Sequence, residues 1–430
     1  MLGPGQRDAL TQQAMLAMQA GRDGEAERLW QQLAAAEPDN AQALLHLGQR
    51  ALQRKDPRTA RSYLDRARAA SPRDPVIPLN QSFLFRQLGD VDGEMAALTA
   101  ALEIDPYFYP ALLAQGMLQE RTGNPRAAAI TYRNVLKIAP PRDRLPEPVR
   151  ASLDRAEELV RKDAEALNAF LEARLEKTRA AHPDADFTRM EHCKDLLTGR
   201  RRVYVPEPAM LQVPYVPPLQ FYDGALFPWL ADVEAATGIM REEFLAVFRE
   251  DNREGFRPYI ERPAGVPLNQ WAELNKSPRW SVFSFWANGV LVEANCARCP
   301  KTVEVLSRVP KCEIANFAPN VLFSLLAPRT TIPSHCGDTN ARLIVHLPLI
   351  VPDGCRFRVG NETREWKVGK AWVFDDTVEH EAVNDSDDLR VIVMIDVWNP
   401  YLAPEERETV AALLNATNEY RAGGRDAHGG

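Results

Sequence analysis

Four prolines recur at an interval of 34 residues in the first third of the chain, at Pro38, Pro72, Pro106 and Pro140. Two further series keep the same interval: a large one (Trp30, Leu64, Leu98 and Tyr132) and a small one (Ala14, Gly48, Ser82 and Gly116). Proline ends a helix, small residues let two helices approach closely, and we expect the large residue to fill the gap between repeats. The period therefore predicts four helical hairpins over residues 7–140, starting near residues 7, 41, 75 and 109.

A period of 34 with this spacing resembles tetratricopeptide repeats, which stack as pairs of antiparallel helices into an α-solenoid with a concave face. Glu94 departs from the small residues at Ala26, Ala60 and Ala128 and makes the third repeat the least regular. We expect the repeat surface to dock a protein or peptide substrate or partner. The chain's own C-terminal domain and a second copy of the chain are the alternatives.

Size, charge and hydropathy limit the number of domains, the kinds of partner and the locations that the chain can have. A chain of 430 residues exceeds one ordinary core, so two or three domains are expected. The formal net charge of −7 argues against nucleic acid as the main partner. The first residues lack the layout of a signal peptide, and no apolar run reaches the ~18 residues of a membrane span. We therefore expect a cytoplasmic protein with no stable membrane insertion.

The segments before and after the β-rich region are predicted to be helices and extended connectors. Residues 141–200 read as a capping helix (149–180) and linker, with the proline-rich stretch 183–223 as an extended connector. Two amphipathic helices are expected at 228–238 and 241–251. A final helix is expected over 399–420, before a disordered tail at 421–430.

The C-terminal half contains a run of short β-rich pieces separated by turn residues. Even spacing of short strands is typical of a sandwich or barrel. The predicted strands are 321–327, 341–351, 355–360, 364–368, 371–376, 380–385 and 389–398. An aromatic strand from Trp280 (WSVFSFWANG) precedes them, and it either lines a substrate cleft or belongs to the core.

Three of the seven histidines, His335, His346 and His380, fall within this β-rich region. Imidazole is the commonest metal ligand, so two of them on different strands can converge on one ion, whereas the alternative is a pair of structural histidines. The six cysteines are expected to be reduced, buried thiols. Cys296 and Cys299 have the spacing of half a zinc site, but a second pair is missing.

Residues 201–415 resemble the aspartyl/asparaginyl β-hydroxylase family of Fe(II)- and 2-oxoglutarate-dependent oxygenases. The resemblance rests on an ordered series of motifs: FPWL, WSVFSFWANG, CPKTVEVLSRVP, HCGDTNARLIVHLPL, GNETREWKVGKAWVFDDTVEHE and RVIVMIDVWNP. It implies a double-stranded β-helix (jelly-roll or cupin-like) domain. The fold class is therefore multidomain α + β, with an N-terminal α-solenoid followed by this domain.

The resemblance also implies roles for individual residues. His335 and His380 match the Fe(II) ligands, and Gly337 stands where most related oxygenases carry a third, carboxylate ligand; the family is known for this glycine, with water in the carboxylate's place. Ser324 and Arg390 match the residues that hold the distal carboxylate of 2-oxoglutarate. His346 and Arg342 match further residues of the cosubstrate site.

Ile344 falls where animal members of the family carry another cosubstrate-binding arginine. Arg356 or Arg358, which share one face of their strand, is expected to replace it. Asp375 and Asp376 are expected to form a turn that orients the His380 segment, or to accept a hydrogen bond from an imidazole.

The implied function is hydroxylation of an unactivated C–H by Fe(II), 2-oxoglutarate and O2. By resemblance the substrate is the β-carbon of Asp or Asn in a protein or peptide that docks with help of the repeats. One alternative is hydroxylation of a small molecule or a lipid acyl chain. Another is a non-catalytic repeat scaffold with a degenerate barrel.

Overall fold

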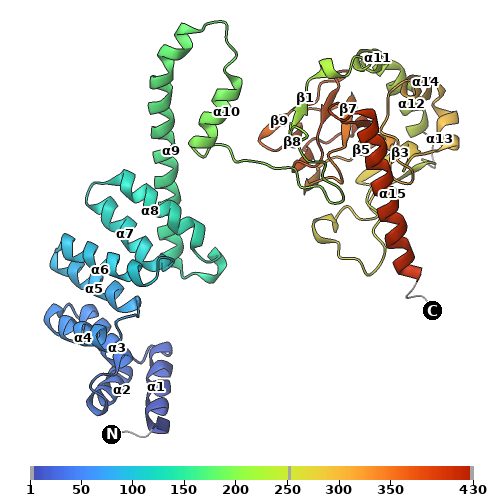
Figure 1. Ribbon diagram of the computed structural model, residues 1–430. Coiled ribbons are helices and arrows are strands. Elements are labelled where there is room, and N and C mark those ends of the chain that lie inside the picture. Colours follow the sequence, from blue (N-terminus) through green and yellow to red (C-terminus); the bar gives the residue numbers. More distant parts are fainter. Residues whose placement is uncertain (1–3, 250–252, 427–430) are drawn as a thin grey trace. The chain divides into compact units, whose positions relative to one another are not determined.

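The computed structural model describes residues 4–249 and 253–426, and these form two compact units that meet at Arg201 and Arg202. The first unit is helical, and the second contains two antiparallel sheets (Figure 1). This confirms the predicted fold class of a helical-repeat unit followed by an antiparallel, jelly-roll-like domain. Within the described residues, no helix has both the length and the apolar character needed to cross a membrane.

The first unit begins with four helical hairpins at the predicted phase. The pairs are α1 (Pro4–Gln19) with α2 (Asp23–Ala36), α3 (Ala41–Gln53) with α4 (Pro57–Ala70), α5 (Val76–Leu88) with α6 (Val91–Ile104), and α7 (Tyr109–Arg121) with α8 (Pro125–Ile138). Each periodic proline follows closely on the end of a second helix. The caps are local, since Asn40 and Asp56, for example, accept hydrogen bonds from backbone N–H groups in the first turns of α3 and α4.

The small and large residues of the repeat pack against each other inside one hairpin. A Cβ at Gly48 would lie 2.8 Å from the Leu64 side chain, and one at Gly116 would lie 2.3 Å from the Tyr132 ring. The large residue therefore fills the space within a hairpin, and the expectation that it fills the gap between repeats is corrected. Glycine is needed at both positions because only its missing side chain leaves room for the neighbouring helix.

Glu94, the residue that departs from the repeat pattern, forms an ion pair between consecutive repeats. Its side chain is 5% exposed and binds Arg121 of α7, whose side chain is 40% exposed. Removing the arginine leaves a buried carboxylate without its cation, whereas removing the glutamate leaves an exposed cation that water solvates. The two ends of this ion pair are therefore unequal in their consequences for stability.

We expect Arg121→Ala to destabilise the repeat unit by about 3 kcal/mol and Glu94→Ala by clearly less, because only the first change leaves a buried charge unpaired. Thermal unfolding of the full chain, followed by the helical circular dichroism signal, measures the two changes. Equal losses of stability, or a larger loss for Glu94→Ala, would contradict this assignment.

Two helices follow the repeats. α9 (Glu147–Ala181) agrees with the predicted capping helix and packs on α8 through Leu153, Ala156 and Leu159. α10 (Thr188–Leu197) corrects the prediction of an extended connector from residue 183 onward. The prolines that motivated that prediction begin at Pro206, whereas 188–197 contains neither proline nor glycine. Lys194 is 7% exposed and bridges Glu172 of α9 and Glu191, which fixes α10 against α9.

The second unit is built on an eight-stranded and a four-stranded antiparallel sheet. The large sheet has the order β1-β10-β7-β12-β5-β3-β2, with β4 paired to β3, and the small sheet has the order β6-β11-β8-β9. The strands are β1 (Phe221–Tyr222), β2 (Phe256–Pro258), β3 (Trp280–Ala287), β4 (Val290–Leu291), β5 (Val321–Leu326), β6 (Thr330–His335), β7 (Arg342–Ile350), β8 (Cys355–Val359), β9 (Glu362–Arg364), β10 (Trp372–Phe374), β11 (His380–Asn384) and β12 (Arg390–Trp398).

Strand β6 was not among the predicted strands, although it carries His335. Its sequence, TTIPSH, contains Pro333, and proline inside a strand argues against a strand because it cannot donate to the ladder. β6 lies at the edge of the small sheet, where the missing donor costs nothing. The strand predicted at 364–368 is shifted in the structure to β9, which pairs with β8.

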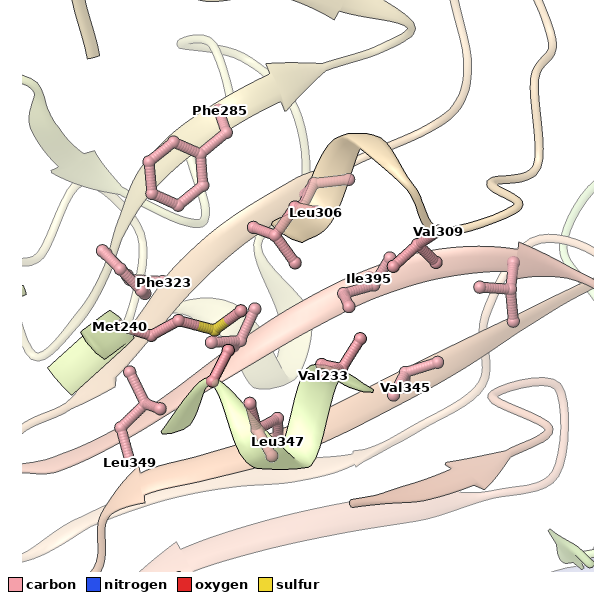
Figure 2. Packing of buried hydrophobic residues seen from close by; sticks show 14 of the residues in the cluster. Val233, Met240, Phe285, Leu306, Val309, Phe323, Val345, Leu347, Leu349 and Ile395 are labelled. Atoms are coloured by element: carbon pink, nitrogen blue, oxygen red, sulfur yellow. The ribbon is translucent and has the colours of Figure 1, made fainter. Parts of the chain in front are cut away.

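Helices cover one face of the large sheet and leave the other face for the site. α11 (Leu230–Ala235), α12 (Thr237–Phe248) and α14 (Pro300–Ser307) pack Val233, Met240 and Leu306 against the sheet residues Phe323, Val345 and Leu347 (Figure 2). Because side chains alternate along a strand, Ile344 and His346 of β7 point to the opposite face, between the two sheets. The helix predicted over 241–251 corresponds to α12, and residues 250–251 lie outside the described residues.

Helix α13 (Glu293–Arg298) precedes α14, and α15 (Pro404–Asp426) closes the chain. α15 passes Tyr420, where the sequence placed its end, so the expected disordered tail is helical through Asp426. Gly423 and Gly424 weaken a helix, but each costs only about 1 kcal/mol. Residues 427–430 lie outside the described part of the chain.

Candidate active site

A cavity of about 590 Å³ opens between the two sheets and gathers all six residues predicted for the site. Ser324 comes from β5, His335 from β6, Arg342 and His346 from β7, His380 from β11 and Arg390 from β12. The six residues are widely separated in sequence, and the pairing of the strands brings them to one place.

His335 and His380 face each other across the β6–β11 pair. They are register partners, and their ring centroids are 4.1 Å apart. Nδ1 of His335 lies 2.7 Å from the carbonyl oxygen of Pro333, and Nδ1 of His380 lies 3.0 Å from that of Val378. A carbonyl only accepts, so each Nδ1 carries the proton and each Nε2 keeps a free lone pair.

Burial keeps this pair neutral. It lowers the pKa of His335, and together with the neighbouring His335 it lowers the pKa of His380 well below the usual value. Neutral imidazole is the form that binds a metal. The acceptors for the imidazole N–H groups are backbone carbonyls, those of Pro333 and Val378, rather than the side-chain carboxylates of Asp375 and Asp376.

The two aspartates instead hold the turn before His380. Asp375 accepts hydrogen bonds from the N–H and the hydroxyl of Thr377. Asp376 accepts one from Arg342 at 2.7 Å, and its carbonyl accepts one from the Gly337 N–H at 2.6 Å. Burial, opposed by the charge of Arg342, raises the pKa of Asp376 to about 7. The predicted role in orienting the His380 segment agrees with these contacts.

Gly337 is required by the position of Asp376. A Cβ at Gly337 would lie 2.1 Å from Oδ2 of Asp376, which is closer than any real contact. Many oxygenases carry a carboxylate ligand at the position of Gly337. Here that position has no room for a side chain, because the carboxylate of Asp376 already occupies the space.

The cations in the cavity differ in how they are neutralised. Arg342 is 7% exposed and lies between Asp376 and Asp396 at 2.7 Å and 3.5 Å; burial lowers its pKa, but the two carboxylates outweigh this and raise it. Arg390 is 1% exposed and, among the described residues, contacts no carboxylate. Its Nη1 lies 3.4 Å from the carbonyl oxygen and 3.5 Å from the hydroxyl oxygen of Ser324, and its Nε has no hydrogen-bond partner in that part of the chain. Burial lowers the pKa of Arg390 to about 10.

A buried cation without a counter-ion calls for an anionic ligand. His346, 5% exposed, adds a second group with unmet hydrogen-bonding capacity, because its Nδ1 has no partner in the described structure. Arg390, Ser324 and His346 therefore form a polar end of the cavity that suits a carboxylate, and the apolar residues Ile344, Phe357 and Ile392 complete its walls.

Neither Arg356 nor Arg358 lines the cavity, so the expectation that one of them replaces the arginine absent at Ile344 is wrong. Phe357, which lies between them on β8, points into the cavity, and strand alternation turns both arginines outward. The cavity contains two further arginines, Arg257 and Arg262, which sequence reasoning did not single out.

Aromatic residues complete the cavity. Trp271 packs edge-on against His335 with a centroid distance of 4.9 Å, and Tyr259 stacks on Trp280 at 4.0 Å. Trp280 also donates a hydrogen bond to the Ser324 hydroxyl, whereas Phe283 and Phe285 of the same strand belong to the core. The aromatic strand thus serves both as cleft and as core. Tyr259 lies in a bend after β2 and Trp271 ends a short 3₁₀ helix (Asn269–Trp271), and no pattern in the sequence marked them.

An extended segment before the domain's helices also fixes the histidine loops. Glu207 donates its N–H to the carbonyl of Thr377, and Ala209 donates to that of Gly337. Val213 and Asn340 exchange two hydrogen bonds of 2.7 Å and 2.9 Å. The loops that follow His335 and precede His380 are therefore both held from residues 207–213.

The six cysteines form no disulfide. Cys299, Cys312 and Cys355 are buried as expected, whereas Cys296 and Cys336 are half-buried and Cys193 is exposed, which corrects the expectation for these three. Among residues 4–249 and 253–426, no group of three or more His, Cys, Asp or Glu side chains is arranged to hold a metal ion. The arrangement that fits a metal is the histidine pair, whose two free Nε2 atoms face a cavity with an anion-binding end.

Comparison with known proteins places this domain. Residues 234–400 match the family model described as Aspartyl/Asparaginyl beta-hydroxylase. The human aspartyl/asparaginyl beta-hydroxylase is 34% identical over 176 residues, which cover 41% of this chain and 22% of that protein. The mouse aspartate beta-hydroxylase domain-containing protein 2 is 37% identical over 177 residues, or 40% of this chain and 50% of that protein.

A bacterial relative, the ornithine lipid ester-linked acyl 2-hydroxylase of Rhizobium tropici, is 33% identical over 198 residues, covering 45% of this chain and 65% of that protein. A thermophilic TPR protein of Thermus thermophilus is similar in structure, with 18% identity, a TM-score of 0.32 and coverage of 44% of this chain and 99% of that chain. The human and mouse relatives are matched over half of their length or less. The sequence match and the site's geometry agree: residues 234–400, within the C-terminal unit, are similar to the aspartyl/asparaginyl β-hydroxylase family.

Proposed function

We propose that this domain is an Fe(II)- and 2-oxoglutarate-dependent dioxygenase that hydroxylates an unactivated C–H. The observation that carries the proposal is the pairing of two neutral histidines, each with a free Nε2, with a buried arginine that has no counter-ion in the same cavity. His335 and His380 would hold the iron. Iron held there would let O2 act as the oxidant, with two electrons from 2-oxoglutarate, which would leave as succinate and CO2, and two from the substrate C–H, which would become C–OH.

The protein's own residues would bind and orient the cosubstrate. Arg390 would donate two hydrogen bonds to the distal carboxylate of 2-oxoglutarate, and the Ser324 hydroxyl would donate a third. His346 would face the rest of the cosubstrate from β7. Phe357, Phe374 and Ile392 would exclude water from this end and so strengthen the pairing of arginine and carboxylate.

Arg342 would support the site from within the protein. Because Asp376 and Asp396 already neutralise it, its contribution is to hold Asp376 beside Gly337 and to fix the turn before His380. The cosubstrate role implied for Arg342 by family resemblance is therefore proposed as indirect. With Ile344 on the same strand, His346 would be the main polar contact for the proximal end of 2-oxoglutarate.

For the substrate, we propose an Asp or Asn side chain of a protein or peptide, recruited with help of the repeat unit. The human and mouse relatives support this by their names. A lipid acyl chain is the second candidate, since the Rhizobium relative is named for a lipid acyl hydroxylation. The charged and aromatic cavity lining favours a polar substrate, because the lining includes Arg257, Glu261 and Arg262.

The test is an anaerobic titration of the full chain with Fe(II) and 2-oxoglutarate, followed by the weak visible absorption band of the complex. We expect a band in the wild type that disappears in His380→Ala. Succinate release on adding O2 with Asp- or Asn-containing peptides, compared with ornithine-lipid vesicles, then separates the two substrate classes. A folded wild-type protein with neither band nor succinate would refute the enzyme and favour a scaffold.

A further inference from the structure

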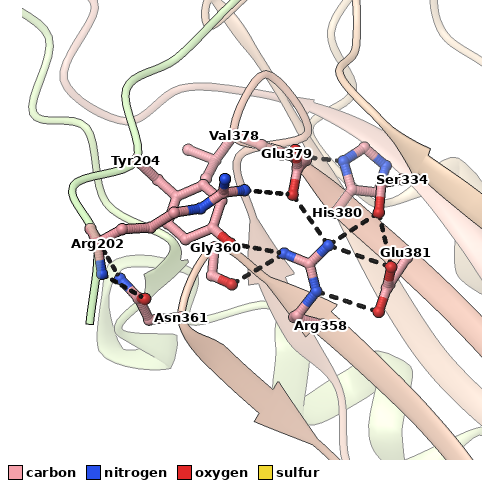
Figure 3. A network of polar contacts seen from close by, with 10 residues as sticks. All are labelled: Arg202, Tyr204, Ser334, Arg358, Gly360, Asn361, Val378, Glu379, His380 and Glu381. Atoms are coloured by element: carbon pink, nitrogen blue, oxygen red, sulfur yellow. Dashed lines mark hydrogen bonds and ion pairs between the residues drawn. The ribbon is translucent and has the colours of Figure 1, made fainter. Parts of the chain in front are cut away.

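Arg358 contacts three residues that are each the chain neighbour of a candidate iron ligand. Its Nη2 lies 2.9 Å from the Ser334 hydroxyl and 3.0 Å from Oε1 of Glu379, and its Nε lies 3.1 Å from Oε1 of Glu381. Ser334 precedes His335, and Glu379 and Glu381 flank His380 (Figure 3). One guanidinium thus ties together both histidine-bearing segments, from the face opposite the cavity.

The strand ladder makes such a tie useful at this point. β11 pairs with β6 at His380 and His335, but the register shifts between His380 and Ala382. At an irregularity of this kind the backbone ladder is locally disrupted, so backbone pairing alone specifies the separation of the two imidazoles less tightly. A side-chain bridge across β8, β11 and β6 fixes the same geometry from outside.

The bridge extends to the segment that enters this unit from the repeats. The Tyr204 hydroxyl lies 3.2 Å from Nη1 of Arg358, and Arg202 binds Glu379 at 2.9 Å. Arg202 is in turn held through its backbone, which exchanges hydrogen bonds of 3.2 Å and 2.6 Å with the Asn361 side chain. Arg202 is the first residue of the second unit, and both Arg202 and Tyr204 lie outside the region matched by the family model.

We propose that Arg358 is a positioning residue that sets the His335–His380 pair for metal binding, and that Arg202 and Tyr204 hold it in place. The term "outer clamp" denotes Arg202, Tyr204, Ser334, Arg358, Glu379 and Glu381. The proposal rests on the proposed function only in requiring that the histidines bind a divalent metal. Through the outer clamp, the segment with Arg202 and Tyr204, which follows the repeat unit in the chain, helps to position the metal site.

The size of the effect follows from the exposure of the clamp. The side chains of Arg358, Glu379 and Glu381 are 20%, 34% and 33% exposed, so solvent screens their ion pairs and little overall stability is at stake. Residues that orient metal ligands nevertheless change metal affinity by ~10- to 100-fold. Loss of the clamp should therefore weaken metal binding without unfolding the domain.

Arg356 provides a matched control. It lies on the same strand and the same outward face, two positions from Arg358. Its side chain makes no hydrogen bond or ion pair within the described residues, and its charge reaches Glu381 only through space, where it helps to lower the pKa of that carboxyl. The experiment measures Co(II) affinity of the full chain from its visible absorption, without 2-oxoglutarate, for Arg358→Met, Arg358→Lys and Arg356→Met. The melting temperature of each metal-free variant is recorded beside it.

We expect Arg358→Met to weaken Co(II) binding about 10-fold or more, Arg358→Lys to restore part of the loss, and Arg356→Met to stay within about twofold of the wild type. Tyr204→Phe should weaken binding by a smaller factor, because it removes one contact to Arg358. If Arg358→Met does not fold, Ser334→Ala carries the test, since it removes the link to the His335 segment without changing charge.

Co(II) affinity that is unchanged in Arg358→Met, or that falls equally in Arg356→Met, would overturn the clamp. A wild-type protein that binds no Co(II) would instead count against the proposed metal site itself, so the two failures are distinguishable.

Discussion

Replacing Arg390 by methionine is expected to weaken 2-oxoglutarate binding strongly and, at the same time, to raise the melting temperature of the ligand-free protein. Arg390 is 1% exposed, and within the described structure its guanidinium has no carboxylate partner and its Nε has no hydrogen bond. Replacement of a buried charge by an apolar side chain of similar size is often stabilising, here by about 1–3 kcal/mol. The Trp366 ring, 5.0 Å from the guanidinium carbon, offsets part of this gain through a cation–π contact.

Cosubstrate affinity changes in the opposite direction. Truncating one partner of a buried charge pair costs 2–5 kcal/mol, so we expect the affinity for 2-oxoglutarate to fall on the order of 100-fold or more. Calorimetric unfolding of the ligand-free chain and anaerobic titration of its Fe(II) form with 2-oxoglutarate measure the two effects. This result would show that Arg390 lowers the stability of the ligand-free protein and raises its affinity for 2-oxoglutarate.

Arg342→Met is the matched control, because Arg342 is also buried, at 7% exposed, but lies between two carboxylates. Its removal leaves the carboxylates of Asp376 and Asp396 without their cation, so we expect the free energy of unfolding to fall by about 3–5 kcal/mol. If Arg390→Met destabilised the protein as much as Arg342→Met, Arg390 would not be the uncompensated cation described above.

Introducing aspartate at Gly337 is expected to damage the site, although it recreates the third carboxylate ligand of many related oxygenases. The new Cβ would lie 2.1 Å from Oδ2 of Asp376, whose carboxylate binds Arg342. Asp376 must move away from Arg342, and a second carboxylate enters the same enclosed space. Overpacking and the added buried charge together should cost about 3 kcal/mol or more.

Thermal unfolding and Co(II) titration of Gly337→Asp, Gly337→Ala and Gly238→Ala measure this effect. Gly337→Ala isolates the steric part and should also destabilise the domain. Gly238 lies in helix α12 with no atom within 4 Å of a Cβ, so Gly238→Ala should be neutral or slightly stabilising. A Gly337→Asp variant that is as stable as the wild type and binds Co(II) more tightly would contradict the assignment of this space to Asp376.

The repeat unit shows how far a periodic sequence can be interpreted. The 34-residue interval located four hairpins because each hairpin repeats the same local contacts, and the small position faces the large one in Gly48 with Leu64 and in Gly116 with Tyr132. Glu94 read as a defect, since its partner Arg121 is 27 residues away and no pattern links the two.

The active-site residues were predicted by a different route. The family resemblance named Ser324, His335, His346, His380 and Arg390, all of which line the cavity. The sequence did not predict the direction in which Arg356 and Arg358 of β8 point. It also did not predict strand β6, because Pro333 argued against a strand. β6 is an edge strand, where the N–H that proline lacks is not needed for pairing.

The sequence by itself determined the repeat unit, the succession of strands and the identity of the candidate ligands, because these depend on local periodicity and on motifs that are contiguous in the chain. Only the tertiary structure decided which charges are neutralised. Arg342 and Arg390 cannot be told apart by their sequence, but Arg342 lies between two aspartates, whereas Arg390 faces the cavity with no counter-ion among the described residues. Burial and pairing depend on residues far apart along the chain, and in this domain they separate a structural arginine from one suited to bind a carboxylate.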